Sequence, residues 1–243
     1  VGRMYYAAMV PCLLSSYTSA LVAHAFGLHA IHGYPVLDPL GLELVPIFQV
    51  SALGVLCAGL SIVFCKAMHT APKLYAKYLP DPLIRAAVGG TLVLVLTLLA
   101  GSQTYNGAGD GVIRRMLAGE TIPEAFVLKI LFTALTLGAG FRGGEIVPVL
   151  FTGCAFGAWA GPILGLPHSF SGALGMAATF CGATNCPLSS IFLAYELFGG
   201  NGLPLYALCC GVSYMLSGYH GLYSEQKIIY SKFKPQWVDK KAE

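Results

Sequence analysis

The chain has 243 residues, of which 56% are hydrophobic and only 10% are charged, and its formal net charge is +3. Soluble globular domains carry about 25% charged residues, so this composition excludes an ordinary soluble domain and indicates an integral membrane protein that contacts lipid. The small net charge gives no reason to expect a nucleic-acid partner. Hydrophobic residues do not alternate with period two, so we expect an all-α polytopic protein rather than a β-barrel.

Four stretches without Lys, Arg, Asp or Glu match or exceed the roughly 20 apolar residues that a membrane-spanning helix needs; they are 4–37, 44–65, 86–109 and 146–195. In chain order we expect helices at about 5–27, 45–68, 83–100 and 123–137. Pro72, Pro80 and Pro82 should break the chain after the second helix, and Gly89-Gly90 should kink the third or make it re-entrant. A polar, glycine-rich loop should precede the fourth helix.

The last third of the membrane part is cut into short pieces by Gly-Pro, Leu-Pro, Cys-Pro and Gly-Gly pairs. The pieces cover about 148–164, 169–183, 187–198 and 203–217. Within hydrocarbon, broken helices are tolerated only where their exposed backbone lines a cavity or is buried in protein. Short, interrupted segments of this kind indicate a transport site at which half-helix ends face the substrate.

The positive charges are distributed unevenly. Four Lys or Arg residues lie in 66–85 and five Lys residues follow Tyr223, whereas 28–45 has none. By the positive-inside rule, the 66–85 region and the C-terminus face the cytoplasm. We therefore expect a multi-pass protein of the cell (inner) membrane with a membrane domain over 1–223 and a cytoplasmic tail over 224–243.

Neither a metal site nor an enzyme centre is indicated. Eight cysteines and six histidines lack metal-ligand spacing, and no serine, cysteine or aspartate lies in a recognisable hydrolase motif. We expect the cysteines to be small packing residues, and we expect no cofactor. Glycines at four-residue spacing should let a second helix approach closely; they are Gly153, Gly157, Gly161 and Gly165.

The stretch GAGFRGGEIVP (138–148) carries the main functional signal. Pro148 suits the first turn of a helix, so a helix should start near 145–147. Its leading N–H groups have no intrahelical partner and, with the positive end of the helix dipole, form a potential anion site. Cys186-Pro187 should open another helix in the same way.

Two roles remain open for Glu145. It could complement the helix dipole as an N-terminal carboxylate. Alternatively, it could lie at membrane depth beside an anion path, where desolvation and a neighbouring anion would favour the protonated carboxyl and allow proton exchange near neutral pH. Glu196 is expected to be structural, and Arg142 could add positive potential near the site. Tyr223 could be an interfacial aromatic or a hydroxyl donor to an anion.

These residues resemble the second half of the CLC family of chloride channels and anion/proton antiporters. GAGFRGGEIVP is similar to the family's G-S-G-x-x-G-G-x-F-x-P motif, and LFTGCAFGAWAG follows it. FCGATNCPLSSIFLAYELFGG (180–200) resembles the family's R-A-P-L-[TS]-x-x-x-L-x-x-E segment, and GLYS (221–224) resembles the stretch with its pore tyrosine. The likeness covers about residues 3–232 and implies an inverted-repeat transporter fold with broken and re-entrant helices.

The resemblance implies a central fluoride or chloride ion held by the backbone around Gly144, Glu145 and Ile146 and by the Tyr223 hydroxyl. Where the family usually has an apolar residue and Phe, this chain has Glu145 and Ile146. A glutamate there is similar to the fluoride-exporting branch, which implies proton transfer by Glu145 and a preference for fluoride over chloride. Arg142 replaces a common proline.

The family's first-half motifs, a G-S-G-x-P-type anion loop and a G-R-E-G gating glutamate, do not occur in these 243 residues. We therefore expect the chain to be a fragment or a half-subunit whose partner is an N-terminal half carrying that glutamate, within a homodimer. Alternatives are a chloride-selective channel, a membrane subunit for structure or assembly, and an intramembrane enzyme, for which we find no motif.

Overall fold

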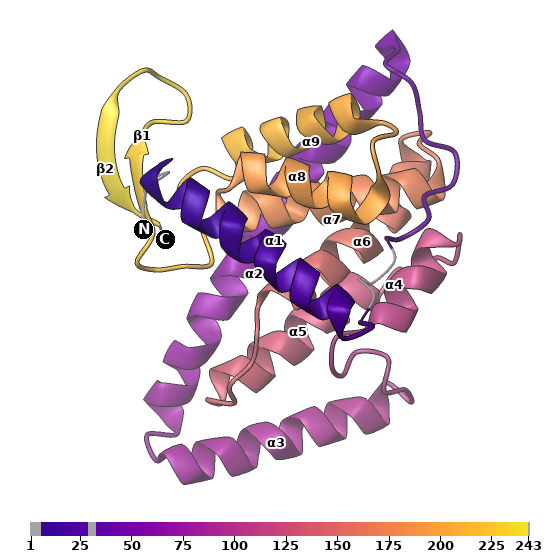
Figure 1. Cartoon of the computed structure of the whole chain (residues 1–243). Helices are drawn as coiled ribbons and strands as arrows, with labels where there is room; N and C mark the ends of the chain where they lie inside the picture. Colours follow the sequence, from indigo (N-terminus) through magenta and orange to yellow (C-terminus); the bar gives the residue numbers. More distant parts are fainter. Residues whose placement is uncertain (1–5, 29–32, 243) are drawn as a thin grey trace.

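Helices make up most of residues 6–28 and 33–242, the part of the chain that this computed structural model describes (Figure 1). A short 3₁₀ turn, Tyr6–Ala8, leads into the first helix, and a small antiparallel hairpin of two strands ends the chain. The elements in order are α1 (Met9–Ala25), α2 (Leu44–Tyr78), α3 (Pro82–Leu99), α4 (Asp110–Leu117), α5 (Ala125–Gly138), α6 (Ile146–Ile163), α7 (His168–Thr184), α8 (Pro187–Phe198), α9 (Leu203–Leu216), β1 (Lys227–Tyr230) and β2 (Trp237–Lys241).

The centre of the molecule is the contact between α6 and α7, which lie side by side in Figure 1. The glycine stripe of α6 makes this contact possible: a Cβ built on Gly153 would lie 2.5 Å from the Gly175 carbonyl oxygen, and one on Gly157 would collide with the Ser171 carbonyl oxygen. The predicted close approach is thus confirmed for this face. Gly165 lies beyond the end of α6 instead, in a left-handed conformation with φ of +79°.

Helix α2 is longer than the sequence predicted. It runs for 35 residues and passes through Pro72, so the expectation of a break at this proline was wrong. A proline inside a helix removes one hydrogen bond, and packing can offset that loss: Gly138 of α5 meets α2 at Ala71 and Tyr75. The helix ends at Tyr78, just before Pro80.

Helix α3 is continuous through Gly89-Gly90, so the predicted kink or re-entrant turn is also wrong. Gly89 instead lets α3 approach Ala139, because a Cβ at this position would collide with the Ala139 side chain. Asp81 caps the helix by accepting a 2.8 Å hydrogen bond from the Leu83 amide. Only 6% of this apolar helix is buried, and Figure 1 shows it at the edge of the molecule.

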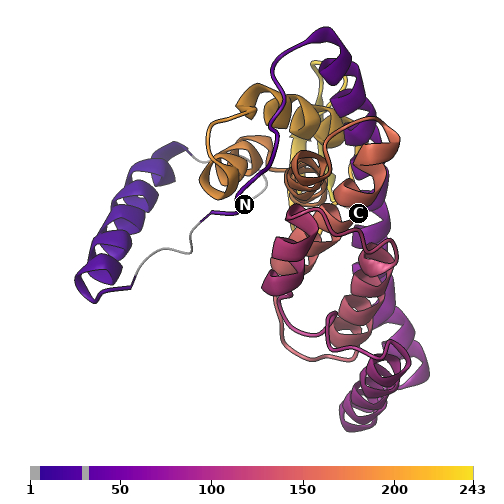
Figure 2. The same cartoon turned by 90° about the vertical axis from the view of Figure 1, so that its right-hand side faces the viewer.

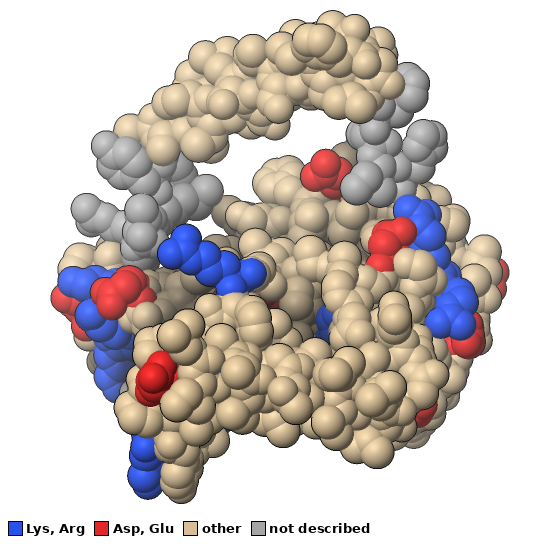
Figure 3. Space-filling model, turned by 90° about the horizontal axis from the view of Figure 1, so that it is seen from below, with Lys and Arg blue, Asp and Glu red and all other residues tan. Residues whose placement is uncertain are grey.

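Three of the described helices, α2, α3 and α6, are long and apolar enough to cross a membrane. Helix α1 has no buried residue in the described chain and stands apart from the other helices (Figure 2). In the view of Figure 3, charged side chains lie mainly toward two ends of the body, and the surface between them is largely uncharged. Such a surface suits contact with lipid.

Helix α4 was missed, because its segment was expected to be a polar loop. It is strongly amphipathic: one face buries Val112, Ile113, Met116 and Leu117, while Asp110 and Arg114 form an exposed ion pair at 2.9 Å. The surrounding glycines and charges concealed this periodicity.

Candidate functional site

The start of α6 forms as the 138–148 motif predicted. Glu145 is the N-cap residue, Ile146 is the first helical residue, and Pro148 lies in the first turn. The Glu145 carboxylate makes no capping hydrogen bond, so it does not act as a side-chain cap. It is half-buried, whereas Ile146 is 43% exposed. The start of α6 is therefore partly exposed, and its N-cap side chain makes no capping hydrogen bond.

Tyr223 lies close to this helix start. Leu222, next to Tyr223, packs in one hydrophobic cluster with Val149 of the first turn of α6 and with Cys65 of α2. His69 of α2 contacts the Gly221 carbonyl in the same segment. The structure thus brings together three elements that are far apart in the sequence. The Tyr223 side chain is 45% exposed. Cys65 and His69 were not assigned to the site, and nothing in their local sequence pointed to it.

Backbone and side-chain hydrogen bonds hold the segment that carries Tyr223. The Leu222 amide donates to the Ala183 carbonyl at 2.9 Å, and the Gln226 side chain donates to the Thr184 carbonyl at 3.0 Å. The Gly221 carbonyl lies 2.8 Å from His69 Nε2. These contacts fix the chain on both sides of Tyr223 against the C-terminal end of α7.

A second helix start lies near the same tyrosine. As predicted, α8 begins at Pro187 with Cys186 as the N-cap residue. The Leu222 amide, next to Tyr223, donates to the Ala183 carbonyl, three residues before Cys186. The segment that carries Tyr223 therefore lies near the starts of both α6 and α8, whose unpaired amides and dipoles favour a negative charge. Sequence reasoning named both helix starts but did not place them around one residue.

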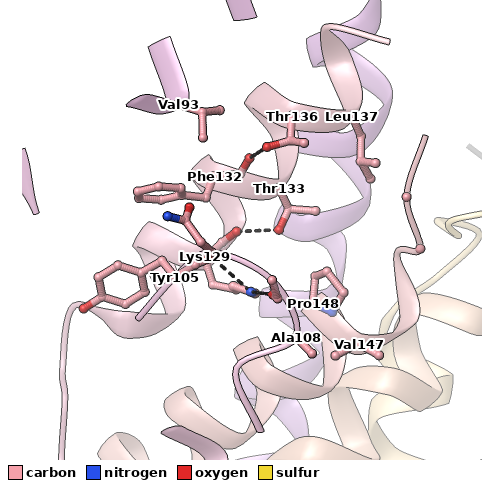
Figure 4. Close-up of a pocket in the computed structure, with 14 residues that line it drawn as sticks. Val93, Tyr105, Ala108, Lys129, Phe132, Thr133, Thr136, Leu137, Val147 and Pro148 are labelled. Carbon is pink, nitrogen blue, oxygen red and sulfur yellow. Dashed lines mark hydrogen bonds between the residues drawn. The ribbon is translucent and has the colours of Figure 1, made fainter. Parts of the chain in front are cut away.

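A cavity of about 450 Å³ opens beside the α6 start (Figure 4). Its wall includes Gly143, Gly144 and Pro148 together with Lys129 of α5. Lys129 is only 2% exposed. Its Nζ donates to the carbonyls of Tyr105 at 3.1 Å and Gly107 at 2.6 Å.

This lysine places a buried positive charge close to the first turn of α6. Its Nζ also lies 4.9 Å from the centre of the Phe151 ring, within the range of a cation–π interaction. The sequence gave no indication of the partners of Lys129, because these carbonyls come from an irregular loop.

The structure gives the exposure of the other residues that the sequence analysis singled out. Arg142 and Glu196 are both exposed. Six of the eight cysteines are buried as expected, Cys186 is partly buried, and Cys12 is exposed on α1, contrary to expectation. Within residues 6–28 and 33–242, no group of three His, Cys, Asp or Glu side chains could hold a metal ion.

Comparison with known proteins identifies the family. Residues 1–218 match the family model of the voltage gated chloride channels. The chain belongs to the CLC family. It is 32% identical over 238 residues to a chloride/fluoride channel protein of Pseudomonas syringae, covering 96% of this chain and 52% of that protein. It is 28% identical over 233 residues to the voltage-gated ClC-type chloride channel ClcB of Salmonella typhimurium, with coverage of 89% and 54%.

The crystal structure of a CLC-type fluoride/proton antiporter has the same fold. It superposes with a TM-score of 0.86 at 27% identity and covers 92% of this chain and 56% of that one. The CLC chain therefore spans about half the length of the relatives it matches. The predicted helical CLC-like architecture is confirmed. CLC proteins are integral membrane channels or antiporters and not enzymes, as the sequence indicated for this chain.

Proposed function

We propose that this CLC chain forms one side of a pathway for small anions, prefers fluoride to chloride, and exchanges the anion for protons. One observation carries the proposal: the start of α6, which Glu145 precedes, and the segment that carries Tyr223 pack together through Val149 and Leu222. Two similar proteins, a chloride/fluoride channel protein and a CLC-type fluoride/proton antiporter, support the same choice.

The physical problem in such a pathway is desolvation. Moving a small ion into a low-dielectric interior costs tens of kcal/mol unless polar groups replace its water. The amides of Gly144, Glu145 and Ile146 and the Tyr223 hydroxyl would supply such donors to a bound fluoride or chloride ion. The Lys129 ammonium, buried near the same helix start, adds favourable potential.

Glu145 would carry the proton. Its carboxylate makes no capping bond and is half-buried beside the proposed ion position, so it is free to change its protonation state. An anion close to it disfavours a second negative charge, which couples the presence of the anion to uptake of a proton. This is the physical basis that we propose for exchange.

The other side of the ion shell would come from a further CLC half. Ile146 and Tyr223 are 43% and 45% exposed in this chain, so the site has room for donors from a second element. We propose that this element is the N-terminal half with the gating glutamate, and that the complete unit works as a homodimer in the cell (inner) membrane. The C-terminus would face the cytoplasm.

The test is ion efflux from proteoliposomes that contain this chain together with the proposed N-terminal half. Fluoride and chloride electrodes measure anion release, and a pH electrode measures the accompanying proton flux. We expect faster release of fluoride than of chloride, with protons moving in the opposite direction. Faster chloride release would favour the chloride-selective channel, and the absence of any anion release would favour a role in structure or assembly.

Glu145→Gln tests the proton role. This variant should keep anion flux and lose the coupled proton flux, because the amide cannot take up a proton. Glu196→Gln is the matched control, since it makes the same chemical change at an exposed position and should leave both fluxes unchanged. Proton-coupled fluoride export that persists in Glu145→Gln would reject the assignment.

A further inference from the structure

Lys232, in the chain after Tyr223, binds the C-terminal ends of α7 and α9. Lys232 Nζ donates to the Tyr214 carbonyl at 2.8 Å and to Ser217 Oγ at 3.0 Å, and it forms a short hydrogen bond to Asn185 Oδ1. It also lies 4.2 Å from the centre of the Tyr214 ring. Lys232 is partly buried, whereas Lys234 is exposed.

The position of this ammonium fits the charge of its surroundings. Asn185, which is left-handed with φ of +56°, is the C-cap residue of α7, and Ser217 is the C-cap residue of α9. Helix C-terminal ends carry unpaired carbonyls and the negative end of the dipole, so both favour a cation. An ammonium group has three N–H donors, and here each has an oxygen acceptor.

Asn185 transmits this contact to the segment around Tyr223. Because its Oδ1 accepts from Lys232, its Nδ2 is directed to the other partners: it donates to the His220 carbonyl at 2.9 Å and to Gln226 Oε1 at 3.3 Å. These two residues lie three positions before and three positions after Tyr223. The Lys232 ammonium can only donate and the His220 carbonyl can only accept, so both favour this orientation of the Asn185 amide over its flipped form.

We propose that Lys232 is a positioning residue for Tyr223. Its ammonium clamps the Asn185 side chain, and Asn185 and Gln226 then hold the chain on both sides of the tyrosine so that its hydroxyl faces the starts of α6 and α8. This inference rests on the proposed anion site and adds a residue from the tail to it. Lys232 would not touch the ion.

The experiment measures fluoride binding to the purified protein by titration calorimetry. Loss of one hydrogen bond to a charged group weakens binding by about tenfold or more, so Tyr223→Phe should raise the dissociation constant for fluoride by about that factor. Lys232→Met should raise it by a similar factor. Lys234→Met, an exposed lysine two residues away, is the matched control and should bind as the wild type does.

The double variant separates positioning from general damage. If Lys232 acts through Tyr223, adding Lys232→Met to Tyr223→Phe should cause no further loss, because coupled residues are not additive. Multiplicative losses in the double variant, or wild-type affinity in Lys232→Met, would overturn the clamp. If Lys232→Met does not fold, Lys232→Gln takes its place, because the amide keeps two N–H donors. A loss of fluoride affinity that is intermediate in Lys232→Gln and does not add to the loss in Tyr223→Phe supports the clamp, whereas additive losses reject it. Wild-type affinity in Tyr223→Phe would instead reject the anion site itself.

Discussion

A methyl group on the central glycine stripe tests whether the α6–α7 contact sets the geometry of the site. The change is Gly153→Ala. Its Cβ would lie 2.5 Å from the Gly175 carbonyl oxygen and 2.9 Å from Thr179 Cβ. An ordinary van der Waals contact begins near 3.4 Å, so the two helices must separate by nearly 1 Å.

The expected cost follows from that displacement. Overpacking a well-packed interior typically costs about 1–3 kcal/mol, and helix backbones cannot rotate away as a flexible side chain can. For a chain of this size, 1 kcal/mol lowers the melting temperature by about 2–4 °C. Gly153→Ala should therefore lower the apparent melting temperature by about 2–12 °C.

The assay is thermal unfolding in detergent followed by fluorescence-detected size exclusion at one fixed heating schedule, because membrane proteins often unfold irreversibly. Gly59→Ala is the control: a Cβ on this glycine of α2 meets nothing within 4 Å, and alanine has a higher helix propensity than glycine. An unchanged or raised melting temperature in Gly153→Ala would refute the close-contact interpretation.

Two further predictions concern the loops around the site. Lys129→Met should lower the melting temperature, because the carbonyl of the buried residue Tyr105 and that of Gly107 lose their donor at a cost of about 1–3 kcal/mol. A higher melting temperature would mean that desolvating the cation costs more than its hydrogen bonds return. Hydrogen bonds from the Tyr34 hydroxyl and then from Arg114 hold the pKa of Asp110 below its usual value of 3.8. This carboxylate contributes less than about 1 kcal/mol of stability, because the group is so exposed. That contribution should be present above pH 3.8 and should be lost as the pH falls through the lower pKa of the folded state. Asp110→Asn should remove this acid dependence in melting curves recorded between about pH 6 and pH 3, and an identical dependence in both proteins would contradict the assignment.

Local sequence rules predicted the helix starts that face the site. Pro148 and Pro187 each suit the first turn of a helix, and both helices begin where these prolines indicate. The glycine spacing of α6 was equally readable, because a four-residue repeat places the bare positions on one helix face. The CLC motifs also joined Glu145 and Tyr223 in one hypothesis, although the two residues lie far apart in the sequence.

The remaining features depend on contacts between distant segments. Pro72 lies inside α2 because packing against α5 offsets the missing hydrogen bond, and no local rule includes that packing. His69 lies about 150 residues from Gly221, its partner. Lys232 counted only as one of five positive charges in the tail, because its three acceptors come from two separate helices.

Because α3 is exposed, we expect the thickness of the bilayer to act on this helix. Its 18 residues span about 27 Å, slightly less than the roughly 30 Å of a typical hydrocarbon layer. A thicker membrane therefore places the helix under hydrophobic mismatch, and any resulting tilt or shift acts on the Gly89–Ala139 contact. Ala139 is the first residue of the loop that ends at Glu145, so we expect lipid chain length to influence the loop at the mouth of the proposed pathway.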